Sequence, residues 1–127
     1  MNSTASILKA DLIEKMNALI VDAIQDIKGK NIVLMDLRHL GDAPTDFFVV
    51  CEGDSTTQVK AIASNIHKRI KEELGFNPAH TEGIQSAQWV LVDYFNTVVH
   101  IFHPETRAFY EIEDLWSDAK VIEYQNI

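Results

Sequence analysis

The turn Gly53-Asp54-Ser55 is one place where this chain could do chemistry, because a Gly-Ser turn before a helix can hold a phosphate group. Enzymes that transfer nucleotidyl groups also need two nearby carboxylates for magnesium, which neutralises developing charge. The helix expected over residues 56–74 has its only acids, Glu72-Glu73, at its far end. Ser55 followed by Gln58 matches a capping box. We therefore interpret the turn as a capped helix start rather than a catalytic loop.

The five histidines and the single cysteine do not form an obvious ligand set. His100 and His103 are three residues apart and would point to opposite faces of a strand, whereas zinc needs four convergent ligands. We expect no metal, no cofactor and no nucleophile: His100 should be a packed, hydrogen-bonded histidine and Cys51 a small core residue. Asp46, after Thr45 at a strand start, should stabilise a turn by accepting backbone hydrogen bonds.

The segment QWVLVDYFNTVVHIF, residues 88–102, could instead bind a partner protein. Strand alternation divides its first half between two faces, with Trp89, Leu91 and Asp93 on one and Val90, Val92 and Tyr94 on the other. Trp89 has two open interpretations, because an indole in such a strand is either a core residue or an interface anchor. As an anchor it would have acidic neighbours, Asp93 and Glu82, which suit a basic partner surface.

Length and composition predict one domain spanning residues 1–127, with a hydrophobic content of 46 % that is enough for a core. The net charge of −8 disfavours sequence-specific or general nucleic-acid binding, because the surface repels phosphates. No run of 18 apolar residues is present, so we expect no membrane partner. The single cysteine fits the reducing cytoplasm, where we expect the protein to be located.

The elements that must position these residues follow from hydrophobic periodicity. The expected order is a helix over 6–27, strands over 31–37 and 46–51, a helix over 56–74, an irregular segment over 76–87, strands over 88–93 and 97–102, a helix over 105–115 and an edge strand over 120–124. The order predicts the α/β class, with a mixed β-sheet flanked by helices. We expect an antiparallel hairpin from the strands over 88–93 and 97–102, and one parallel pair from the crossover through the helix over 56–74.

Several segments in a fixed order resemble the ribosomal silencing factor family, also called Iojap or RsfS. They are Ala43–Cys51 (APTDFFVVC), Gly53 with Ser55, Gln58–Ala63 (QVKAIA), Glu82-Gly83, Trp89–Tyr94 (WVLVDY), Val98–Phe102 (VVHIF), Arg107–Tyr110 (RAFY) and Leu115-Trp116. The resemblance covers about residues 18–116, and its specificity comes from the order and spacing of the segments together.

The resemblance implies a nucleotidyltransferase-like fold that is catalytically inactive. It implies a translational repressor that binds the large ribosomal subunit at ribosomal protein fourteen, sterically blocks association with the small subunit and lowers translation under nutrient limitation. It also implies a homodimer when the protein is free. The residues that match the family's partner-binding surface are Glu82, Gly83, Trp89, Leu91, Asp93 and Tyr94.

One position departs from the family pattern. A glycine or other small residue and then an aspartate usually follow the tyrosine, and Phe95-Asn96 stands there in this chain. One negative charge is lost and one aromatic side chain is gained. Phe95 is either a substitute contact or a packed turn residue.

Two other functions remain open from the sequence. The first is a residual nucleotide-binding or nucleotidyltransferase-like enzyme that acts through the turn at Gly53-Asp54-Ser55. The second is a dimeric scaffold in which the apolar hairpin serves only self-association.

Overall fold

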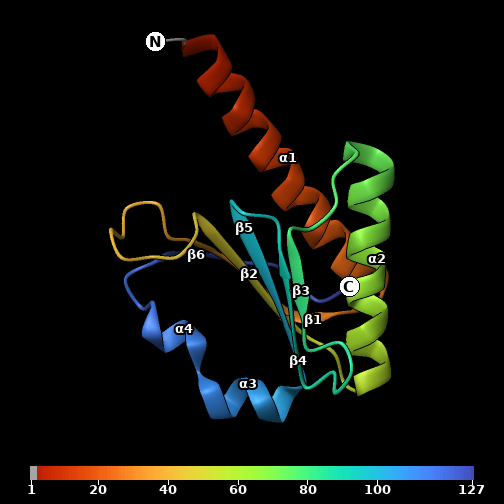
Figure 1. The fold of residues 1–127 in the computed structure, drawn as a ribbon. Helices are drawn as coiled ribbons and strands as arrows, with labels where there is room; N and C mark the ends of the chain where they lie inside the picture. Colours follow the sequence, from red (N-terminus) through yellow and green to blue (C-terminus); the bar gives the residue numbers. More distant parts are fainter. Residues whose placement is uncertain (1–2) are drawn as a thin grey trace.

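A six-stranded mixed sheet with helices on both faces forms the fold in the computed structural model, which describes residues 3–127 (Figure 1). In chain order the elements are α1 (Ser3–Asp26), β1 (Lys30–Asp36), β2 (Phe47–Glu52), α2 (Thr56–Leu74), β3 (His80–Glu82), β4 (Trp89–Asp93), β5 (Thr97–Phe102), α3 (Pro104–Tyr110), α4 (Ile112–Leu115) and β6 (Lys120–Glu123). The predicted α/β class is confirmed. Within the described residues, every helix is too short or too polar to cross a membrane.

The strands lie in the order β3-β4-β5-β2-β1-β6. The central pair, β2 and β5, is parallel, and the pairs described on either side of it are antiparallel. This arrangement confirms the predicted parallel pair, the hairpin of β4 and β5, and the edge strand near the end of the chain. β2 and β5 are almost wholly buried, as expected for strands covered on both faces.

The two faces of the sheet have separate hydrophobic cores. On one face, α1 and α2 pack against apolar side chains such as Val49, Val90 and Ile101. On the other face, a smaller cluster around Phe48 and Phe102 is covered by α3, α4 and the segment after β1. Because the second cover is short, part of this face stays accessible to a partner.

Helix α2 begins and ends at the residues that the sequence predicts. The Ser55 hydroxyl oxygen accepts a hydrogen bond from the Gln58 N–H at 3.1 Å, which confirms the N-cap. Gly75 has φ 77° and donates its N–H to the Ile70 and Lys71 carbonyls, which confirms the C-terminal cap.

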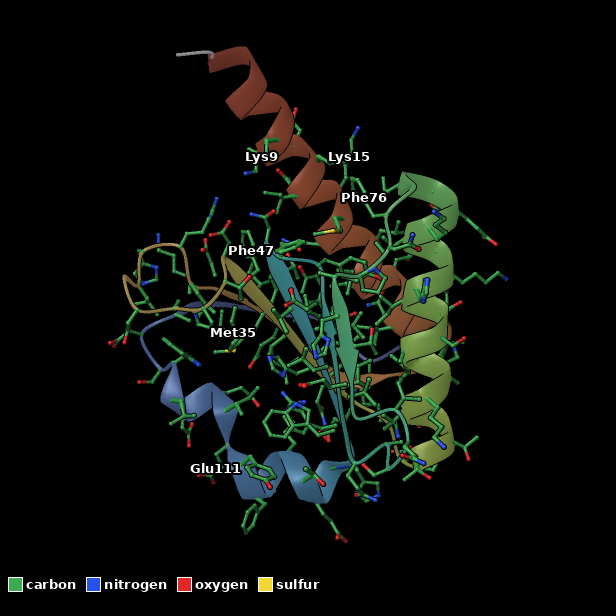
Figure 2. All side chains as sticks on the ribbon, viewed as in Figure 1. Lys9, Lys15, Met35, Phe47, Phe76 and Glu111 are labelled. Carbon is green, nitrogen blue, oxygen red and sulfur yellow. The ribbon has the colours of Figure 1, made fainter. Side chains whose placement is uncertain are left out.

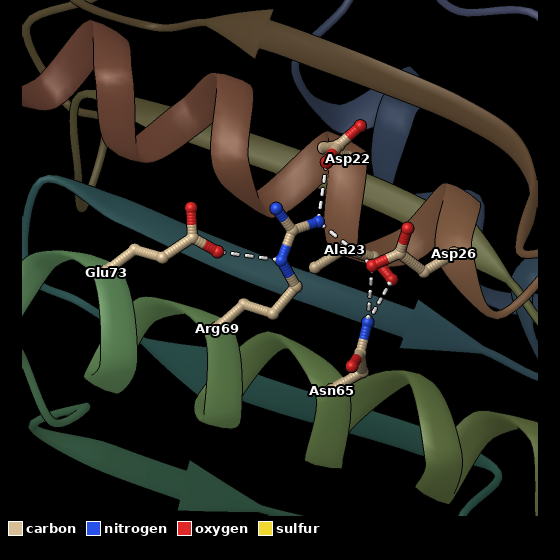
Figure 3. Close-up of polar contacts among 6 residues, drawn as sticks. All are labelled: Asp22, Ala23, Asp26, Asn65, Arg69 and Glu73. Atoms are coloured by element: carbon tan, nitrogen blue, oxygen red, sulfur yellow. Dashed lines mark hydrogen bonds and ion pairs between the residues drawn. The ribbon is translucent and has the colours of Figure 1, made fainter.

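Arg69 of α2 joins the two helices through an ion-pair network (Figure 3). Its guanidinium contacts Asp22 and Asp26 of α1 and Glu73 of α2. Hydrogen bonding to these carboxylates raises the pKa of Arg69. Asn65 donates to the Ala23 carbonyl at 2.8 Å, so the polar edge of α2 fixes its register against α1.

Two predicted segments differ from the structure. β3 lies inside the segment predicted to be irregular, and it pairs with β4. The helix predicted over 105–115 is broken at Glu111, which has φ 47° and separates α3 from α4 (Figure 2). Arg107 holds this break in place, because its guanidinium donates to both Glu113 carboxylate oxygens and to the Asn31 carbonyl.

Candidate partner-binding surface

Strand register places four of the six predicted site residues on one face of the sheet. Trp89, Leu91 and Asp93 alternate with the buried Val90 and Val92 along β4. Glu82 of β3 pairs with Leu91, so both side chains project from the same face. We call Glu82, Trp89, Leu91 and Asp93 the β4 surface.

The Trp89 side chain packs into the second core and stays partly exposed, so its geometry is compatible with both interpretations that the sequence leaves open. Its ring stacks on Phe102 at a centroid distance of 4.8 Å and lies 5.0 Å from the Tyr110 ring. Its indole N–H donates to Nδ1 of His100 at 3.0 Å. The residue is nevertheless only half-buried, so the packed ring presents a fixed apolar edge to solvent.

His100 forms part of the floor of this face, between Leu91 and Val50 in neighbouring strands. Only 5 % of the residue is exposed, and burial lowers its pKa to about 4. The imidazole is therefore neutral at pH 7, and because Nδ1 accepts from Trp89, its proton lies on Nε2. The Phe48 ring packs at 79° to it, with centroids 4.5 Å apart. The expected packed, hydrogen-bonded histidine is confirmed.

Asp93 has a structural role in the turn between β4 and β5. Its Oδ1 accepts the Phe95 N–H at 2.7 Å, and the Tyr94 N–H donates to the Thr97 carbonyl across the turn. Phe95 has φ 71° and is 76 % exposed. The other carboxylate oxygen of Asp93 makes no hydrogen bond or ion pair within the described residues.

Asp46, which directly precedes β2, stabilises the same turn. Its Oδ2 accepts from the Asn96 side-chain amide at 3.0 Å. The predicted acceptor role is confirmed, but the donor is a side chain rather than the expected backbone N–H, because the turn of the hairpin folds over the start of β2. The Thr45 hydroxyl donates to the Phe95 carbonyl and holds the turn from the same side.

Two predicted site residues lie apart from the β4 surface. Tyr94 points to the opposite face and is buried under the helices, where desolvation raises its pKa to about 12. Gly83 has φ 83°, and a Cβ there would lie 2.0 Å from the Trp89 carbonyl oxygen. Gly83 therefore allows the chain to pass close to Trp89, and it positions the surface through its backbone.

A hollow of about 340 Å³ opens beside the β4 surface. Its lining is apolar except for one carboxylate, one hydroxyl and the neutral imidazole, and consists of Pro44, Thr45, Phe48, Leu91, Asp93, Phe95, Val98 and His100. Sequence reasoning missed the contribution of Phe48 and Pro44, which come from the preceding strand and loop. Their only sequence signal is that the APTDFF segment is one of those that resemble the family.

The backbone N–H groups of Gly53 and Asp54 in the turn at Gly53-Asp54-Ser55 are occupied within the protein. The Gly53 N–H donates to the Phe102 carbonyl at 3.0 Å, and the Asp54 N–H donates to Oε1 of Gln58 at 2.6 Å. The Asp54 carboxylate also pairs with Lys30 at 2.9 Å. A phosphate group at this turn would have to displace these contacts.

Cys51 lies in the core between the sheet and the helices, as expected for a small apolar residue. Burial raises the pKa of its thiol to about 12, so the reactive thiolate is disfavoured at neutral pH. Among the described residues, no group of three or more histidine, cysteine, aspartate or glutamate side chains is arranged to hold a metal ion.

Comparison with known proteins shows which family the chain is similar to. Residues 10–127 match the family described as ribosomal silencing factor during starvation. The ribosomal silencing factor of Halalkalibacterium halodurans is 36 % identical over 114 residues, which cover 90 % of this chain and 96 % of that protein.

A crystal structure of a Chromobacterium violaceum protein has a TM-score of 0.78 and 39 % sequence identity, covering 83 % of this chain and 86 % of that chain. A mouse protein described as mitochondrial assembly of ribosomal large subunit protein 1 is 36 % identical over 75 residues, which are 58 % of this chain and 33 % of that protein. Sequence and fold therefore agree on one family.

Proposed function

This chain belongs to the ribosomal silencing factor family, and on that basis we propose that it is a cytoplasmic translational repressor that binds the large ribosomal subunit. We propose that its contact there is ribosomal protein fourteen, and that the bound domain sterically blocks association with the small subunit under nutrient limitation. The name of the mouse relative, which refers to the large ribosomal subunit, supports the choice of subunit.

The observation that carries the proposal is the half-exposed β4 surface. Trp89 is held by stacking and by its hydrogen bond to His100, so little side-chain entropy is lost when a partner covers it. Glu82, whose Oε1 lies 3.0 Å from Nε2 of His80, and the free oxygen of Asp93 add carboxylates to the same face. An aromatic anchor with acidic neighbours fits a basic protein surface.

We also propose that the chain is not an enzyme and that its fold is a nucleotidyltransferase-like scaffold without catalysis. The occupied donors at Gly53 and Asp54 support this view, because a phosphate cradle needs free backbone N–H groups. A thermal shift assay with magnesium nucleotides tests it. No change in melting temperature is expected, and a concentration-dependent rise of several degrees would contradict it.

The free protein is proposed to be a homodimer. The exposed apolar side chains of Phe95, Phe109 and Leu115, each more than 70 % exposed, are available for self-association. Light scattering over a dilution series tests this part separately. A monomer mass at the highest concentration would contradict it without affecting the proposed ribosome contact.

Co-sedimentation with isolated large and small ribosomal subunits, at low and physiological salt, tests the central proposal. Binding to the large subunit alone is expected, followed by a loss of subunit joining in a sucrose-gradient assay. Folded protein that sediments with neither subunit would overturn the proposed function.

Two variants examine the β4 surface in the same assay. Asp93→Asn removes the charge but keeps an Oδ1 acceptor for the Phe95 N–H, so weaker binding would report the charge rather than a damaged turn. Trp89→Ala is expected to cost about 2–4 kcal/mol of binding free energy. Ile122→Thr is the control, because Ile122 is an exposed apolar residue on β6 at the opposite edge of the sheet. Melting temperatures of all three variants show whether the fold is intact.

A further inference from the structure

The conformation of Phe95 is the least expected feature of the described chain. It is the middle one of the three residues between β4 and β5, and its φ is 71°. Hairpin turns with positive φ at this position favour glycine, since a side chain there is strained. A large aromatic residue at such a position needs a reason, and its 76 % exposure means that packing in the core does not provide one.

The turn holds the Phe95 backbone from three directions. Asp93 accepts its N–H at 2.7 Å, Thr45 donates to its carbonyl, and Asn96 is tied to Asp46 at 3.0 Å. These contacts come from β4, from the segment before β2 and from the turn itself. The backbone that carries the phenyl ring is therefore already ordered in the free protein, before a partner binds.

The ring stands beside the hollow of about 340 Å³ next to the β4 surface. Phe48, Leu91 and Val98 give this hollow an apolar floor. The only carboxylate in its lining belongs to Asp93, which has a free oxygen. His100 in the floor is neutral and adds no positive charge that would repel a cation.

We propose that Phe95 is a specificity-determining wall of this hollow, and that the hollow receives one lysine or arginine side chain of the partner protein. The alkyl part would lie on the apolar floor, the cation would meet Asp93, and the Phe95 ring would contribute a cation–π contact. The inference rests on the proposed function and adds the chemistry of one contact within it.

Substitution of Phe95 by glycine tests the proposal, because glycine removes the phenyl ring and is also the residue that a positive φ favours. Phe95→Gly relieves the positive φ, so we expect this variant to stay folded, and its melting temperature checks that expectation. Large-subunit affinity would be measured by co-sedimentation titration for the wild type, Phe95→Gly, Phe95→Leu and Phe95→Tyr. Ile122→Thr again serves as the exposed apolar control.

We expect Phe95→Gly to weaken binding about tenfold, since apolar contact and cation–π attraction are both lost. Phe95→Leu should weaken it about two- to fivefold, because a leucine keeps the apolar wall but has no π face. Phe95→Tyr and the control should bind within about twofold of the wild type.

Different results separate the two proposals. If the wild type binds the large subunit and Phe95→Gly binds it equally well, the role of Phe95 is overturned while the proposed function stands. Equal affinity of Phe95→Leu and the wild type would overturn the cation–π contact, and unchanged affinity of Asp93→Asn would overturn the basic occupant. Failure of the folded wild type to bind the large subunit would overturn the proposed function, and this inference with it.

Discussion

His100 shows how one buried side chain can set the pH response of the whole fold. The imidazole is enclosed by Trp89, Phe48 and Phe102, and burial holds its pKa near 4. In the unfolded chain its pKa returns to about 6.5. Between these two values the unfolded state binds a proton that the folded state does not bind. The contribution of His100 to the free energy of unfolding is therefore fully present above pH 6.5 and is lost as the pH falls towards 4.

We therefore expect wild-type stability to fall by about 3 kcal/mol more than that of His100→Gln between pH 7 and pH 4. Glutamine is chosen because its side-chain oxygen can still accept the Trp89 N–H. Urea unfolding at a series of pH values measures the difference. Parallel curves for the two proteins would show that His100 does not carry this pH dependence.

Phe95 should reduce the stability of the folded protein because of its positive φ. Phe95→Gly is expected to raise the free energy of unfolding by about 1 kcal/mol, since a left-handed backbone costs a side-chain-bearing residue about 1–2 kcal/mol. Part of the gain is offset by the greater freedom of glycine in the unfolded chain. Chemical denaturation of both proteins gives the change, and a loss of stability would mean that the phenyl ring packs in the folded state.

At the scale of the elements, the connection between β3 and β4 brings the two strands of the candidate site into register. Gly83 lies at its start with φ 83°, directly beside the backbone of Trp89. Ala87, which has φ 55°, donates its N–H to the Gly83 carbonyl and closes the turn. The position of the proposed anchor Trp89 therefore depends on a residue that makes no side-chain contact.

Gly83→Ala should destabilise the fold by about 2–4 kcal/mol, because the new Cβ would meet the Trp89 carbonyl oxygen and the backbone disfavours a side chain. Gly41→Ala is the matched control, since no atom lies within 4 Å of a Cβ at that position. We expect the control to change stability by less than about 0.5 kcal/mol. Equal melting temperatures for the two variants would contradict the close approach at Gly83.

The sequence predicts the larger elements of this fold and misses the smaller ones for physical reasons. Ser55, Gln58 and Gly75 are local signals, and they mark both ends of α2 correctly. β3 has three exposed residues without apolar alternation, so its pairing depends on β4 and leaves no local pattern. The break at Glu111 has no glycine or proline to announce it, and it depends on the distant contacts of Arg107.

The candidate site was only partly predictable for a related reason. Alternation along β4 correctly separates Trp89, Leu91 and Asp93 from their buried neighbours. It cannot show that Glu82 pairs with Leu91, because that requires the register of β3. Phe48 also reaches the hollow through a parallel pairing that is not local in sequence. The role of the β4 surface in partner binding stays a prediction.

For the whole molecule, the net charge of −8 limits the kind of surface that the proposed ribosome contact can use. The three arginines are all engaged with acidic residues of the protein itself. The eight lysines are outnumbered by nineteen acidic residues, so the protein as a whole repels RNA phosphates. We therefore expect the proposed ribosome contact to be made with a basic protein surface.

We expect no measurable binding to protein-free ribosomal RNA at about 50 mM salt, where nonspecific contacts are strongest. Filter binding with labelled RNA tests this, and intact large subunits in the same buffer are the positive control. RNA binding that weakens steeply with salt would show that phosphate contacts contribute.

The hairpin turn at Phe95 also has a consequence for folding kinetics. The parallel pair at the centre joins Phe47 to Thr97, so the chain must close a long loop before the sheet is complete. The β4–β5 hairpin is local and can form before that closure. If this hairpin belongs to the folding nucleus, its strained turn slows folding, and a glycine at position 95 would increase the folding rate more than it decreases the unfolding rate. The residue that we assign to partner contact would then also determine how quickly each new chain becomes able to bind.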